Sequence, residues 1–152
     1  MKVARDVMEP AALVPSSLDV AELARRMLAS DVEGVCVVEE GDRLVGVVTG
    51  MDLVFREKKV HPPVTFALLD LVLSFGTRRT ERELEKMAAV TVAELMTREV
   101  TTALPDTPID EVATRMVEDH LSMIPVLEGG VPIGVITRRG MVAATLRHLV
   151  GD

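Results

Sequence analysis

The sequence contains one short phrase twice, and this internal repeat constrains the fold more than any other feature. Residues 46–53 read GVVTGMDL, and residues 134–141 read GVITRRGM. Each copy begins with Gly-Val, continues with an aliphatic residue and a threonine, and leads into an apolar run. The first copy has Asp52 where the second has Gly140. A sequence that repeats in this way predicts two similar supersecondary units packed together.

Each copy of the phrase closes a predicted β-hairpin. The first follows the aliphatic run at 35–39 and a Glu-Gly-Asp turn, and the second follows the run at 124–128 and a Gly-Gly turn. Aliphatic runs on both sides of a glycine turn are typical of a hairpin. The first turn is one residue longer, which explains why Gly134 lies 88 positions after Gly46 while the preceding helices are offset by 89.

An amphipathic helix is predicted before each hairpin. Apolar residues recur at i, i+3, i+4 and i+7 over 20–27 and again over 109–116, and this spacing gives one apolar stripe that faces a core. Ser17 and Thr107 are the expected N-caps. A short extended stretch ending in proline precedes each helix, at 12–15 and 102–105.

The repeating unit is therefore strand, helix, strand, strand, helix. Further helices are expected after the two phrases and within the intervening segment, at 51–57, 139–149, 65–75 and 81–89. One unit of roughly 55 residues is too small to bury its own sheet, so we expect an α/β (α+β) fold with two βαββα repeats about a quasi-two-fold axis. The expected division is repeat 1 at 1–57, a helical insert or linker at 58–92, and repeat 2 at 93–152.

These features resemble the cystathionine-β-synthase (CBS) domain family. The residues that carry the resemblance are Met8, Met96, the hairpin pairs Val37-Val38 and Pro125-Val126, and above all Gly-Val-Val-Thr-x-x-Asp at 46–52. Two tandem units are similar to a Bateman module, and the insert resembles that of small stand-alone bacterial CBS-pair proteins. The resemblance implies a disc-like homodimer with a cleft between the repeats. It also implies non-catalytic, regulatory binding of AMP, ADP, ATP or S-adenosylmethionine there, with occupancy signalled to an unidentified partner protein.

Asp52 is the candidate ribose ligand. It follows a predicted strand and opens a predicted helix, where a carboxylate can accept two hydrogen bonds from vicinal hydroxyls. The Thr49 hydroxyl can reach phosphate or ribose, and the first amides of the following helix suit phosphate. The alternative is that Asp52 only caps the helix and Thr49 only ends the strand.

The family pattern implies that this nucleotide also contacts the second repeat. Adenine is expected between Val100 and Pro125, because pockets for flat bases are mostly apolar. Arg139 is expected at the phosphate, and its alternative is an ordinary surface arginine. The full expected set is Thr49, Asp52, Val100, Thr101, Ser122, Met123, Pro125 and Arg139. A second, weaker cleft is expected to contain Leu13, Cys36, Thr137 and Arg138.

Two positions depart from the family pattern. Gly140 leaves the second cleft without a ribose acceptor, and Glu33 stands where some relatives carry a basic phosphate ligand. A carboxylate at that place repels phosphate, although Arg138 could offset it. The sequence thus predicts two unequal clefts, with the Asp52 cleft the better one. The same departures favour an alternative function, a structural dimerisation protein with degenerate clefts.

Other classes of function find little support in the sequence. A net charge of −7 argues against nucleic acid as the main partner. The single cysteine excludes an internal disulfide, and no Cys/His cluster suits zinc. His61, His120 and His148 have no nucleophile or carboxylate at a catalytic spacing, so we expect no enzyme and no required cofactor. The N-terminus lacks an apolar signal core and no segment suits a bilayer, so a cytoplasmic location is expected.

Overall fold

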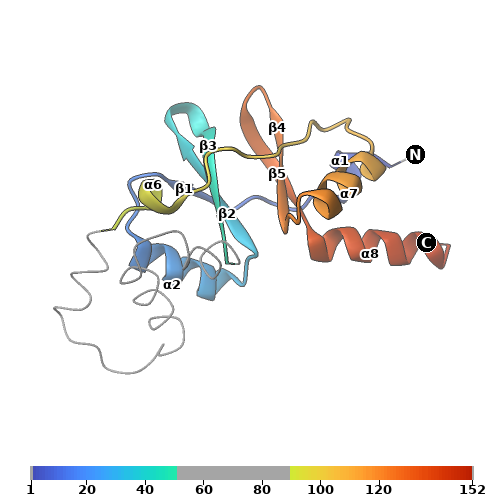
Figure 1. Ribbon diagram of the computed structural model, residues 1–152, viewed down its shortest axis with the longest axis horizontal. Coiled ribbons are helices and arrows are strands. Elements are labelled where there is room, and N and C mark those ends of the chain that lie inside the picture. The colour runs from blue at the N-terminus through green and yellow to red at the C-terminus, as the bar shows by residue number, and fades with distance from the viewer. Residues whose placement is uncertain (1, 51–89, 152) are drawn as a thin grey trace.

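The computed structural model describes residues 2–50 and 90–151. Asp52, the predicted helix at 51–57 and the helices expected in the insert lie outside the described residues. The described chain forms two α/β units side by side (Figure 1). Its elements are α1 (Ala4–Val7), β1 (Leu13–Pro15), α2 (Val20–Ser30), β2 (Gly34–Glu39), a 3-10 turn (Glu40–Asp42), β3 (Arg43–Thr49), α6 (Val92–Leu95), α7 (Ile109–Glu118), β4 (Met123–Glu128), β5 (Val131–Thr137) and α8 (Arg138–Leu149).

Both predicted hairpins are present, and their turns explain the change of offset along the repeat. In the first unit β1 pairs parallel with β2, which pairs antiparallel with β3. In the second unit β4 pairs antiparallel with β5. The first hairpin turns through Glu40–Asp42 and the second through the shorter Gly129-Gly130, and a register shift follows at the same place in each. The predicted difference of one turn residue is therefore confirmed.

The extended stretch predicted at 102–105 forms a single parallel bridge, between Ala103 and Val126, and not a strand. Ala103 makes both of its main-chain hydrogen bonds to β4, and the ladder stops there because the next residue that would face β4, Pro105, has no N–H. The Leu104 amide donates to the Thr107 hydroxyl at 2.9 Å. This hydrogen bond means that Thr107 is not the helix cap. The N-cap of α7 is Pro108.

The other predicted cap is also corrected by the structure. Asp19, not Ser17, precedes α2, and its Oδ1 accepts a hydrogen bond from the Glu22 amide at 2.7 Å. A carboxylate is a strong N-cap and favours the positive end of the helix dipole. The helices predicted at 20–27 and 109–116 are present as α2 and α7, and α2 begins one turn after Ser17.

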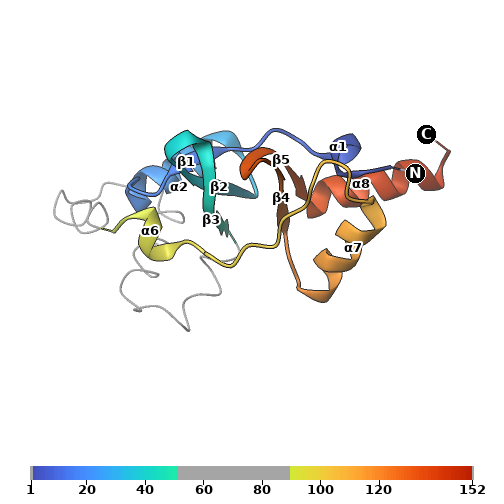
Figure 2. The ribbon, with the colours of Figure 1, turned by 90° about the horizontal axis from the view of Figure 1, so that it is seen from above.

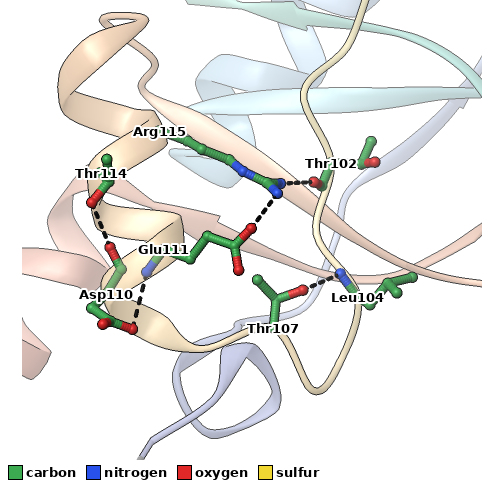
Figure 3. A network of polar contacts seen from close by, with 7 residues as sticks. All are labelled: Thr102, Leu104, Thr107, Asp110, Glu111, Thr114 and Arg115. Carbon is green, nitrogen blue, oxygen red and sulfur yellow. Dashed lines mark hydrogen bonds and ion pairs between the residues drawn. The ribbon is translucent and has the colours of Figure 1, made fainter.

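Side chains of α7 hold the extended stretch against the helix (Figure 3). Arg115 donates from Nη1 to the Thr102 carbonyl at 2.8 Å and pairs with Glu111 one turn earlier at 2.6 Å. Both side chains are partly exposed, so the ion pair contributes little free energy by itself. Its effect is to place the guanidinium between helix and stretch.

The short N-terminal helix of each repeat packs against the other repeat. Ala4 of α1 is fully buried in the core of the second unit beside Val112 and Ile124. Val92 of α6 is likewise buried in the core of the first unit beside Leu23. Figures 1 and 2 show α1 next to α7 and α8, which are far from it in sequence, and away from β1, the next element of its own repeat. This exchange interlocks the two units.

The exchange explains the glycine of the repeated phrase. A Cβ at Gly46 would lie 2.7 Å from the Met96 Sδ, and a Cβ at Gly134 would lie 2.8 Å from the Met8 Sδ. Each glycine therefore makes room for the methionine that follows the short helix of the opposite repeat. Adjacent main-chain bridges, Val47 with Thr97 and Glu9 with Val135, fix the same contact.

A third apolar cluster lies between the two hairpins. It contains the buried side chains of Cys36 and Val47 from the first unit with Met123 and Val135 from the second. The strands are thus covered on both faces, by their own helices on one side and by the other unit on the other. Strands buried on both faces are continuously apolar, which explains the uninterrupted run Val-Cys-Val-Val at 35–38.

Candidate ligand clefts

Two clefts open between the units among the described residues. We call the first the Thr49 cleft. It has a volume of about 360 Å³. Three segments form it: the end of β3, the segment after α6, and the loop between α7 and β4. Its lining residues are Val47, Thr49, Thr97, Glu99, Val100, Thr101, His120, Leu121, Ser122, Met123 and Arg138.

The second, which we call the Thr137 cleft, is built in the same way with the repeats exchanged. It has a volume of about 260 Å³. The end of β5, the segment after α1, and the loop between α2 and β2 form it. Its lining residues are Glu9, Pro10, Ala12, Ser30, Asp31, Val32, Glu33, Gly34, Met123, Val135, Thr137 and Arg139.

Corresponding backbone in the two clefts confirms the predicted two-fold relation of the repeats. Asp31 and His120, offset by 89 positions, both have a positive φ, of 48° and 52°. This conformation is uncommon for residues other than glycine. The same unusual turn therefore aims the loop into each cleft.

Five of the residues predicted around one nucleotide meet in the Thr49 cleft. They come from both repeats, although as many as 74 positions separate them in the sequence. They are Thr49, Val100, Thr101, Ser122 and Met123. Asp52, the sixth and most important, lies outside the described residues.

Pro125 does not line the Thr49 cleft. It sits within β4, two residues past Met123, and its side chain is fully buried opposite Val135. Leu13 and Cys36, in the paired strands β1 and β2, likewise line neither cleft. The clefts are lined instead by residues at or just before the starts of these strands, which are Ala12, Gly34 and Met123.

The two adjacent arginines occupy the opposite clefts from those predicted. Arg138 lines the Thr49 cleft and Arg139 lines the Thr137 cleft. Neighbouring residues at a helix start point about 100° apart, so the two side chains diverge. The Arg138 amide donates to the Ser122 carbonyl at 3.0 Å. This bond ties the first residue of α8 to the loop that forms the Thr49 cleft.

The threonine of each repeated phrase lies at the base of its cleft. The exposed fractions of Thr49 and Thr137 are only 7% and 5%. Thr137 is the N-cap of α8, because its Oγ1 accepts from the Gly140 amide at 3.0 Å. Met123 lines both clefts and forms the wall between them.

Several charged residues that line the clefts were not predicted from the sequence. Glu9 and Asp31 join Glu33 in the Thr137 cleft, whereas His120 and Glu99 line the Thr49 cleft. The repeat offset of 89 relates Glu33 to Ser122 and would also have related Asp31 to His120. The signal was therefore present in the internal alignment of the repeats.

Cys36 is expected to resist thiol reagents as long as the chain stays folded. Burial raises the pKa of its thiol to about 12, and the side chain is fully inaccessible. A coloured disulfide reagent at pH 8 should label it only after denaturant is added. Equal labelling rates in folded and denatured protein would contradict this packing.

The raised pKa of the Cys36 thiol also predicts how the stability of the fold changes with pH. Because the folded pKa is raised, the thiol contributes stability below its unfolded pKa of about 8.5, and that contribution is lost as the pH rises toward about 12. Denaturation of Cys36→Ala should lack this alkaline loss.

Two further features are absent from the described residues. No group of three or more His, Cys, Asp and Glu side chains is arranged to hold a metal ion. No helix in that part of the chain is both long enough and apolar enough to cross a membrane.

Comparison with known proteins identifies the family. A profile of the CBS domain matches residues 4–59 and again 92–147. The chain belongs to the CBS domain family. Its two matched segments coincide with the two interlocked units, so the predicted CBS domain pair with two βαββα-like repeats is confirmed.

Three known chains align with most of this one. Uncharacterized protein MJ1426 of Methanocaldococcus jannaschii is 25% identical over 93% of this chain and 90% of its own. CBSX2, a CBS-pair protein from Arabidopsis thaliana, solved in complex with AMP, has a TM-score of 0.72 at 24% identity, over 98% of this chain and 99% of its own. The CBS domain pair of protein MJ0100, solved with 5′-methylthioadenosine and S-adenosyl-L-methionine, has a TM-score of 0.71 at 21% identity, over 97% and 98%.

Proposed function

We propose that this CBS pair is a regulatory module that binds an adenosine nucleotide in the Thr49 cleft. The observation that carries the proposal is that one cleft collects apolar, hydroxyl and cationic side chains from both repeats. Its volume of about 360 Å³ lies within the range of small-molecule sites. The structures of CBSX2 with AMP and of MJ0100 with adenosyl compounds add support.

The lining suggests how such a ligand would be held. Val47, Val100 and Leu121 offer apolar surface to the adenine ring, and the hydroxyls of Thr101 and Ser122 offer polar contacts at its edge. The proposed ribose ligand is Asp52, three positions after Thr49 as Gly140 is three after Thr137. In this proposal Pro125 supports β4 from within and does not touch the base.

A ligand in this cleft would bridge the two interlocked units, because its lining comes from both. Binding would therefore favour one arrangement of the repeats over others. This is the property of a sensor that reports occupancy to a partner, and we propose no catalytic step.

A thermal-shift screen against AMP, ADP, ATP, S-adenosylmethionine and NAD tests the proposal. A ligand at a hundredfold excess over its Kd stabilises the folded chain by about 2.7 kcal/mol, which raises the Tm by several degrees. We expect this for at least one adenosine nucleotide. No shift with any of the five would contradict the proposal and favour the structural dimerisation protein, and turnover of the ligand would indicate an enzyme.

We further propose that the chain forms a homodimer through α8. The exposed apolar residues Val142, Leu146, Leu149 and Val150 follow the spacing i, i+4, i+7 and i+8, so they form one stripe on this helix. An apolar stripe of this kind is typical of a helix that packs against a partner. Together with the predicted disc-like assembly, it supports a second copy of the chain as that partner.

Light scattering should therefore give twice the mass of one chain at micromolar concentration. Leu146→Glu should shift the chain to a monomer, because it places a charge in the stripe. Arg147→Glu, one residue further on another side of the helix, is the matched control and should remain dimeric. A monomeric wild-type chain would contradict the proposal.

A further inference from the structure

The charges that line the two clefts differ. Among the described residues, the Thr137 cleft has the carboxylates of Glu9, Asp31 and Glu33 with only Arg139 to balance them. The Thr49 cleft has one described carboxylate, Glu99, with Arg138 and the imidazole of His120. Like charges in a partly enclosed site repel more strongly than in bulk water. A phosphate group would therefore meet repulsion in the Thr137 cleft and attraction to Arg138 in the Thr49 cleft.

Arg138 is positioned for an anion by its own hydrogen bonds. Its amide donates to the Ser122 carbonyl at 3.0 Å, and its Nη2 donates to the Leu121 carbonyl at 3.3 Å. The guanidinium is thus fastened to the loop that lines the Thr49 cleft. The Leu121 carbonyl accepts from one of the five N–H donors of the guanidinium. This carbonyl has no net charge, so it leaves the positive charge of Arg138 uncompensated.

The described arginines differ in whether they pair with a carboxylate. Four of the nine, Arg5, Arg25, Arg26 and Arg115, do so within 3.4 Å, and Arg138 belongs to the other five. Within the described part of the chain, no carboxylate forms an ion pair with Arg138. A guanidinium that is held beside a cleft and lacks such a partner is suited to a bidentate hydrogen bond with phosphate.

We propose that Arg138 makes the Thr49 cleft selective for adenosine ligands that carry a phosphate, and that the carboxylates of the Thr137 cleft exclude them. The inference rests on the proposed function and specifies its ligand class. The Thr49 cleft takes anionic nucleotides such as AMP in preference to adenosine or to cationic S-adenosylmethionine.

Calorimetric titration of AMP and of adenosine into three full-length chains tests this selectivity. The wild type should bind AMP at least about tenfold more tightly than adenosine, because charge-assisted hydrogen bonds to phosphate are strong. Arg138→Gln should lose about tenfold to a hundredfold of the AMP affinity and keep its adenosine affinity. Arg139→Gln is the matched control, since it removes the neighbouring charge from the other cleft, and its AMP affinity should stay within about twofold.

The outcomes separate this inference from the proposed function. A wild type that binds neither compound overturns both. A wild type that binds AMP and adenosine equally overturns the selectivity alone. Equal loss of both affinities in Arg138→Gln would mean that the side chain only supports the loop through Leu121, and unchanged AMP binding would exclude Arg138 from the site.

Discussion

Replacing Asp52 by alanine is expected to weaken AMP binding at least about a hundredfold. The variant removes two hydrogen bonds from ribose hydroxyls to a carboxylate, each contributing about 1.5–3 kcal/mol, and their sum corresponds to a factor of about a hundred or more. Asp52→Asn should be milder, because the amide oxygen still accepts. Isothermal titration calorimetry measures both affinities.

The matched control for this prediction is Asp110→Ala. Asp110 is an acidic residue in the first turn of α7 and lines neither cleft, so its removal changes charge and a helix start without touching the site. Its AMP affinity should equal that of the wild type. If Asp52→Ala lowers the Tm but binds AMP like the wild type, Asp52 is a helix cap and the proposed ribose contact is wrong.

Gly46→Ala is expected to destabilise the fold by about 1–3 kcal/mol, as overpacking of a filled interior does. The new Cβ would lie 2.7 Å from the Met96 Sδ and 2.9 Å from the Thr97 carbonyl oxygen. The methionine can move, but the carbonyl accepts from the Val47 amide at 3.0 Å and is held by that bridge. Chemical denaturation followed by circular dichroism measures the change.

The equivalent glycine of the second repeat allows the same experiment, and another glycine serves as a control. Gly134→Ala should have a similar effect, because its Cβ would lie 2.8 Å from the Met8 Sδ. Gly50→Ala is the control, since no atom outside its neighbourhood lies within 4 Å of the added Cβ. Equal stabilities of Gly46→Ala and Gly50→Ala would contradict the packing of each short helix against the opposite repeat.

Features that depend on local pattern were predictable from the sequence. Both hairpins, α2, α7 and the one-residue difference between the turns follow from apolar spacing and glycine position. Caps were less predictable, because Thr107 has a competing partner in the Leu104 amide and Asp19 competes with Ser17. The exchange of α1 and α6 between the units has no local signal, since it depends on contacts such as Ala4 with Val112, 108 positions apart, and Val92 with Leu23, 69 positions apart.

The residues that line the clefts were also only partly predictable from the sequence. Thr49, Val100 and Ser122 line one cleft, as the family resemblance implied. Arg138 and Arg139 were interchanged, because spacing along the chain does not say to which side of a helix start a side chain points. Pro125 was assigned to the cleft from the family pattern, but its depth within β4 is a property of the packed sheet.

The predicted inequality of the clefts gains support from charges that the sequence analysis did not consider. Glu33 lines the Thr137 cleft, and Glu9 and Asp31 add to its negative charge. The Gly140 amide donates to Thr137, which also lines this cleft. The Thr49 cleft keeps the arginine that is fastened to its own loop. The repeated phrase at 46–53 and 134–141 has the same folding role in both units, through its glycine, buried valine and threonine. We propose that only the first copy also binds a nucleotide.

The stoichiometry of AMP binding tests this central claim most directly. Calorimetric titration of the wild-type chain should show one AMP bound per chain, and Asp52→Ala should remove that binding while the fold is retained. Two AMP molecules bound per chain with equal affinity, or one that Asp52→Ala still binds at full strength, would contradict the assignment of the Thr49 cleft as the single nucleotide site.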